Sequence, residues 1–127
     1  MDVDAIKDLL AAGDIASARA CLLELVSNQP ASEAGWLLLS GVSARTDDAE
    51  LGAKAFRALA GLRPSDALAS SGLVWALMRL QNYAGAKVEI ERFSRFVDLT
   101  IPSHCSVAQE HREAMEMIQR SSGVWNQ

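Results

Sequence analysis

The chain has 127 residues, 50% of them hydrophobic and 22% charged, and its net charge is −4. A chain of this length forms one domain that buries roughly two-thirds of its unfolded surface, and this composition excludes a disordered polymer. The acidic balance without any basic run argues against nucleic-acid binding, the two cysteines make no disulfide framework, and no segment approaches the ~20 apolar residues of a membrane-spanning helix.

Alanine and leucine dominate the chain, whereas β-branched and aromatic residues are scarce, which favours helix over strand. We expect helices over 3–12, 15–28, 33–45, 49–61, 67–80 and 83–98, and a seventh over 103–121. A single domain would then span residues 1–121, and 122–127 would be a flexible tail. The acidic N-terminus has no feature of a secretory signal, so we expect a cytoplasmic protein.

A period of 34 residues organises these helices, since Pro30 and Pro64 are 34 positions apart. It divides the chain into blocks over about 1–32, 33–66 and 67–100. The expected turn inside each block falls at Gly13-Asp14, Asp47-Asp48 and Gln81-Asn82. A small residue follows each turn at Ala18, Gly52 and Ala86, and a large apolar one comes four positions later at Leu22, Phe56 and Ile90. These sizes at these spacings are typical of two helices packed closely as a hairpin.

On these residues the chain resembles a tetratricopeptide-repeat (TPR) protein over about residues 3–100. The second block matches best, through Trp36, Leu39, Gly52, Phe56 and Pro64. The third block keeps Leu73, Tyr83 and Ala86 but has Ser70 in place of the first aromatic residue and Asp98 in place of the closing proline. The resemblance implies an all-α, right-handed α-solenoid of about three hairpins, with 103–121 as a capping helix over the last one.

In such arrays the first helix of each hairpin lines a concave groove that holds a peptide. The residues that the resemblance places in this groove are Leu37, Gly41, Arg45, Leu68, Ser71, Trp75, Met78 and Arg79. Arg45 and Arg79 are 34 positions apart and would suit a partner segment with acidic and apolar side chains. Two alternatives stay open: the arginines are solvated helix ends, and Trp75 packs against the capping helix.

Some TPR domains clamp acidic chaperone tails with lysines and asparagines. The equivalent positions here are Val3, Lys7, Leu38, Leu68 and Gly72, of which one is basic, so that ligand class is disfavoured.

No constellation in the sequence indicates catalysis or a cofactor. His104, Cys105 and His111 match no zinc signature, and we expect the histidines to be exposed near a helix start. Cys21 is expected to be a buried structural thiol. No nucleophile elbow, phosphate loop or paired-carboxylate motif is present.

We therefore expect a non-catalytic protein-interaction module, an adaptor or chaperone of bacterial type that needs no cofactor or metal and inserts into no membrane. Type III secretion chaperones with three repeats resemble it in architecture only. The alternatives are a self-associating assembly protein, including a homodimer, and the amino-terminal interaction module of a larger enzyme.

Overall fold

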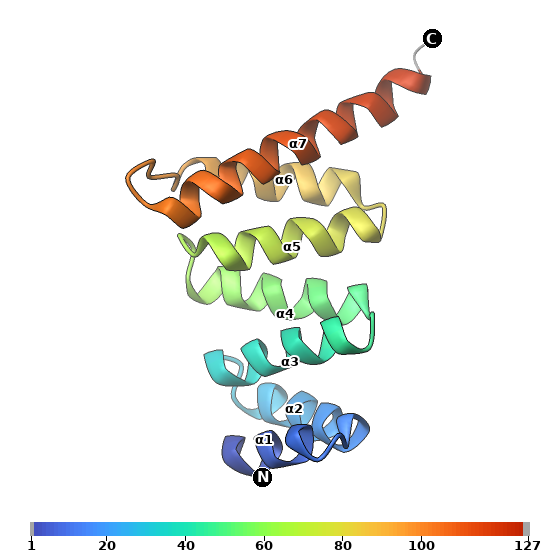
Figure 1. Ribbon diagram of the computed structural model, residues 1–127, viewed down its shortest axis with the longest axis vertical. Helices are drawn as coiled ribbons and strands as arrows, with labels where there is room; N and C mark the ends of the chain where they lie inside the picture. The colour runs from blue at the N-terminus through green and yellow to red at the C-terminus, as the bar shows by residue number, and fades with distance from the viewer. Residues whose placement is uncertain (1, 126–127) are drawn as a thin grey trace.

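The computed structural model describes the backbone of residues 2–125 and the surroundings of the side chains of residues 2–121. Within this part of the chain seven helices follow one another and no strand is present. They are α1 (Val3–Ala11), α2 (Ile15–Asn28), α3 (Glu33–Arg45), α4 (Ala49–Leu62), α5 (Ala67–Arg79), α6 (Tyr83–Ser94) and α7 (Pro102–Trp125). The expected all-helical fold is confirmed, and the helices are stacked in chain order along the long axis of the molecule (Figure 1).

The turns inside the three hairpins share one backbone geometry. Gly13, Asp47 and Gln81 take left-handed φ values of 82°, 53° and 58°. The N–H of the next residue then bonds back to a carbonyl five positions earlier, from Asp14 to Leu9, from Asp48 to Ser43 and from Asn82 to Leu77, at 2.8–2.9 Å. The side chains of Asp14, Asp48 and Asn82 also cap the following helices. The 34-residue period is thus present in the local structure of the turns.

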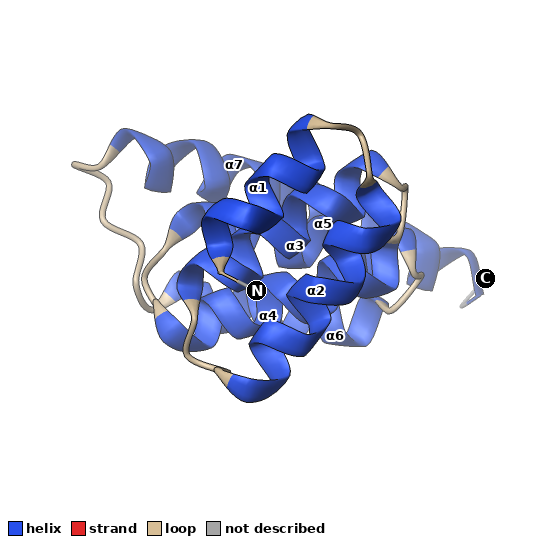
Figure 2. Cartoon of the chain, turned by 90° about the horizontal axis from the view of Figure 1, so that it is seen from below, coloured by secondary structure: helices blue, strands red, loops and turns tan. Residues whose placement is uncertain are grey.

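Consecutive helices pack against each other, and α7 packs against both α5 and α6. Seen along the long axis, α1, α3, α5 and α7 lie on one side and α2, α4 and α6 on the other (Figure 2). This arrangement fits a helical repeat, in which every element buries its apolar face against its neighbours.

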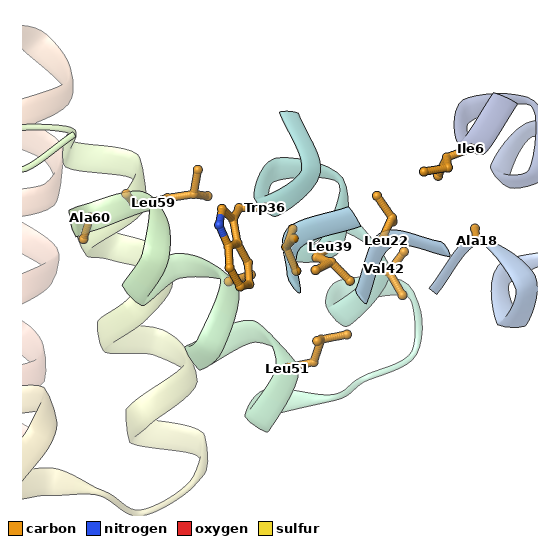
Figure 3. Packing of buried hydrophobic residues seen from close by; sticks show 12 residues of the cluster. Ile6, Ala18, Leu22, Trp36, Leu39, Val42, Leu51, Leu59 and Ala60 are labelled. Atoms are coloured by element: carbon orange, nitrogen blue, oxygen red, sulfur yellow. The ribbon is translucent and has the colours of Figure 1, made fainter. Parts of the chain in front are cut away.

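The core follows the array as connected clusters of buried side chains. One cluster joins α1 to α4 and extends to α5; Ile6, Leu22 and Leu39 are fully buried in it, and Trp36 donates its indole N–H to the Pro30 carbonyl at 2.7 Å (Figure 3). A second cluster joins α4, α5, α6 and α7. Because each cluster spans several helices, removal of a terminal helix would expose the apolar face of the next one.

The largest departures from the sequence prediction lie at the end of the array. α6 ends at Ser94 rather than at residue 98, because the Phe96 N–H bonds to the Phe93 carbonyl and tightens the last turn. A turn follows in which the Thr100 N–H and hydroxyl both donate to Asp98 Oδ1, at 2.9 and 2.6 Å.

α7 is longer than predicted and runs through Trp125. Residues 122–125, predicted to belong to a flexible tail, are helical, and 126–127 lie outside the described residues. One glycine inside a helix costs only about 1 kcal/mol relative to alanine, so Gly123 does not end it. The last turns of α7 project beyond α5 and α6 (Figures 1 and 2).

No described helix combines the length and the apolar character needed to span a bilayer.

Candidate functional site

The predicted groove residues divide into two groups. Ser71, Trp75, Met78 and Arg79 line two adjoining grooves on the side formed by α3, α5 and α7. Leu37, Gly41, Arg45 and Leu68 are exposed on α3 and α5 but line neither groove. Of the predicted groove residues, those that line a groove therefore all lie on α5.

The first groove, which we call the α5–α7 groove, has a volume of about 360 Å³. Its walls are mainly apolar, and they are formed by Val74, Trp75 and Met78 from α5 and by Ala114 and Met117 from α7. The polar residues that line it are Ser71, Glu110, His111 and Glu113. Ser71 Oγ donates to Glu110 Oε2 at 2.7 Å, which joins the two walls at this point.

The second groove, which we call the α3–α5 groove, has a volume of about 420 Å³ and a more polar lining. It is lined by residues of three helices and one helix cap. These include Ser40 and Ser43 of α3, Asp48 at the N-cap of α4, Phe56 of α4, and Gly72 and Arg79 of α5. Trp75 and Ser71 line both grooves, so the two grooves adjoin at these residues of α5.

Trp75 is 69% exposed although it faces α7 across a groove. The capping helix therefore leaves most of this side chain uncovered. The neighbouring α7 residue Met117 is 57% exposed. Large apolar side chains that cluster in a groove with this exposure are a feature of interaction surfaces.

Arg79 is not a free cation. Its guanidinium pairs with the carboxylate of Asp47, the residue with left-handed φ in the α3–α4 turn. Arg45 is exposed in the last turn of α3, where a positive charge interacts favourably with the helix dipole. For Arg79 the structure thus shows an ion pair between successive hairpins, which neither sequence interpretation anticipated.

The charges around the α5–α7 groove are negative. Glu110 and Glu113 line it, and both are exposed on α7. Of the residues that the structure describes, no lysine or arginine lines this groove. Arg112 projects instead toward the hollow between α6 and α7.

Behind this groove lies a buried polar network that sequence reasoning missed. Ser70 is fully buried, and Glu89 and His111 are 5% exposed. Ser70 Oγ donates to Glu89 Oε2 at 2.6 Å and lies 2.9 Å from His111 Nε2. Because the only hydroxyl proton goes to the carboxylate, His111 Nε2 must carry a proton and donate it to Ser70.

Arg92 completes the network from α6. Its Nε and one terminal nitrogen bond to the two oxygens of Glu89 at 2.6 and 2.7 Å, and its other terminal nitrogen donates to the Pro64 carbonyl at 2.9 Å. The hydrogen bond to Glu89 raises the pKa of Arg92. Burial lowers the pKa of His111, although Glu89 and Glu110 oppose this effect.

Both histidines differ from the sequence expectation, because they are buried rather than exposed. His104 is 6% exposed and accepts the Asp98 N–H at 3.1 Å. Its ring and that of His111 pack against Phe93, at centroid distances of 5.3 and 5.8 Å. The histidines therefore help to attach α7 to α6.

This serine, histidine and carboxylate do not form a nucleophilic triad. In such a triad the carboxylate orients the histidine and the serine faces substrate. Here Glu89 binds Ser70 and Arg92, and Ser70 has no exposed surface. Among the described residues, no three His, Cys, Asp or Glu side chains converge as metal ligands. Cys105 is exposed, and Cys21, which was expected to be buried, is half-buried against the first core cluster; both are free thiols.

No known protein family matches the chain, and no curated protein shows significant similarity to it.

Proposed function

We propose that this protein is a non-catalytic interaction module, an adaptor or chaperone that holds a segment of a partner protein across Trp75. We further propose that its helices form a right-handed TPR-like solenoid, whose α3, α5 and α7 provide the docking face. The single observation that carries the proposal is the exposed indole of Trp75 between two grooves, with Met78 and Met117 beside it.

Energetic reasoning supports this use of the surface. Burying an aromatic side chain against a partner removes a large apolar area from water, and each Å² contributes about 25 cal/mol. Tryptophan is among the residues that most often dominate binding energies at interfaces, whereas flexible methionines adapt to the shape of the bound segment.

The test is quantitative affinity capture from a lysate of the native cells, with three immobilised proteins compared by mass spectrometry. The wild type is compared with Trp75→Ala and with Val88→Ala. Val88 is 66% exposed on α6, outside both grooves, so its truncation is a matched control. A partner retained by wild type and Val88→Ala but lost by Trp75→Ala supports the proposal. Equal recovery by all three would reject this docking face.

Self-association is a second candidate, favoured by a different surface. The hollow between α6 and α7 has a volume of about 280 Å³ and is lined mainly by Ile90, Phe93, Val97, Ala108 and Met115. An apolar hollow at the end of a helical array is where a further helix of another copy would pack. Light scattering with wild type and Met115→Lys separates the candidates. A concentration-dependent dimer that the substitution abolishes would favour self-association, whereas a constant monomer mass would exclude it.

A further inference from the structure

We propose that the α5–α7 groove selects a basic amphipathic segment, with lysine or arginine beside its apolar anchor residues. This inference rests on the proposed function and names the chemistry of the partner. It reverses the acidic partner that the arginine pattern of the sequence predicted.

The walls of the groove determine the anchors. Trp75 and Met78 on α5 face Ala114 and Met117 on α7, and in each pair the residues are three positions apart. Residues at this spacing share one face of a helix, so the two helices present two apolar rows with a channel between them. An amphipathic helix with apolar residues at i, i+3 or i+4, and i+7 fits such a channel.

The edge of the groove determines the charge. Glu110 and Glu113 lie three positions apart on α7, and among the described residues no lysine or arginine lines the groove to neutralise them. His111 lines the groove between them, but it is 5% exposed, and this burial lowers its pKa and so favours the neutral ring. Of the nearby cations, Arg79 already pairs with Asp47, and Arg112 lies on the side of α7 that faces α6. A partner lysine or arginine would therefore find two carboxylates whose charges no lining residue compensates.

One hydrogen bond to each carboxylate fixes its position at the groove. Ser71 Oγ holds one oxygen of Glu110, and Gln109 Nε2 donates to Glu113 Oε1 at 3.2 Å. Each contact leaves acceptor positions of the carboxylate open to a cation. An arginine in the partner could also stack on the exposed face of Trp75.

An acidic segment would meet the opposite situation. Its carboxylates would lie beside Glu110 and Glu113, and the repulsion between like charges disfavours that complex. Arg79, which lines the α3–α5 groove together with Trp75, is already paired with Asp47.

The experiment is selection from a phage-displayed library of random 16-residue peptides on four forms of the full chain. These are the wild type, Trp75→Ala, the double variant Glu110→Gln/Glu113→Gln, and Glu116→Gln. Glu116 is an exposed glutamate of the same helix outside the groove, so it controls for loss of negative charge in general. Affinities of the enriched peptides are then measured by fluorescence anisotropy at low and high salt.

We expect the wild type and Glu116→Gln to enrich peptides with helically spaced apolar residues and an excess of lysine and arginine. The double variant should bind these peptides about two- to thirtyfold more weakly, as expected for the loss of two partly exposed ion pairs. Raising the salt concentration should remove most of that difference.

The two proposals fail in different ways. Peptides that require Trp75 but carry no excess of basic residues would overturn this inference and leave the docking function standing. No enrichment, or enrichment that Trp75→Ala does not reduce, would overturn both.

Discussion

The buried network behind the groove makes a specific prediction about two adjacent serines. Ser70→Ala removes a fully buried hydroxyl that donates to Glu89 and accepts from His111. Glu89 keeps its two bonds to Arg92, but the His111 N–H loses its partner in a site that is 5% exposed. Leaving one buried donor without a partner costs about 1–3 kcal/mol. For a chain of this length that corresponds to a decrease in Tm of about 4–11 °C.

Ser71→Ala is the matched control, since its hydroxyl also donates to a glutamate on another helix, Glu110, but in an exposed position. Both substitutions gain the same small amount of helix propensity, which cancels in the comparison. We expect Ser71→Ala to change the free energy of unfolding by about 0.5 kcal/mol or less. Urea titrations followed by circular dichroism at 222 nm measure both. Equal losses for the two variants, or a smaller loss for Ser70→Ala, would refute the reasoning that burial gives this network its strength.

Three further predictions concern pH, packing and the groove. Because burial holds the pKa of His111 below its usual 6.5, the unfolded chain binds more protons just below that value. The neutral His111 side chain therefore contributes its full stabilisation above about pH 6.5, and this contribution is lost as the pH falls toward the pKa of His111 in the folded chain. His111→Gln should flatten this part of the plot of urea midpoint against pH. Gly72→Ala would place a Cβ 2.5 Å from the ring of Phe56 and should destabilise the fold by about 1–3 kcal/mol. The Cβ added by Gly41→Ala meets nothing within 4 Å, so this substitution should stabilise the helix by about 0.5–1 kcal/mol. Thermal melting measures both changes. Trp75→Ala should leave Tm within about 2 °C of wild type, because its side chain is 69% exposed; a larger decrease would show that Trp75 acts in folding.

The sequence predicted the features whose causes are local. The turns at Gly13-Asp14, Asp47-Asp48 and Gln81-Asn82 were predictable from the 34-residue interval. In the structure the first residue of each turn adopts left-handed φ and the second caps the next helix. The helices between these turns followed from alanine, leucine and apolar spacing. Their stacking followed from the regular interval, since each hairpin presents the same apolar face to the next.

The buried network could not be predicted from local signals, because its members are far apart in the chain. Ser70 contacts residues 19 and 41 positions away. One signal was nevertheless present: Ser70 occupies the position that Trp36 fills in the preceding block, and Glu89 the position of Ala55. Two polar residues at core positions of the same block indicate that their side chains form a hydrogen bond with each other.

The acidic lining of the α5–α7 groove could not be predicted, for a related reason. Equivalent positions made Arg45 and Arg79 resemble a row of free cations. The pairing of Arg79 with Asp47 and the placement of Glu110 and Glu113 opposite Trp75 depend on how α3, α5 and α7 pack. The sequence period contains no information about α7, which lies outside the three blocks.

The central claim is that a partner segment docks across Trp75. The most direct measurement is an NMR titration of the ¹⁵N-labelled chain with a peptide selected as above, in which the indole N–H of Trp75 and the amides of Ser71, Met78 and Ala114 are followed. The largest shifts should fall on these four groups, while Val88 and Ala84, which lie on α6 outside both grooves, stay unchanged. Largest shifts at Val88 and Ala84, with Trp75 unaffected, would contradict it.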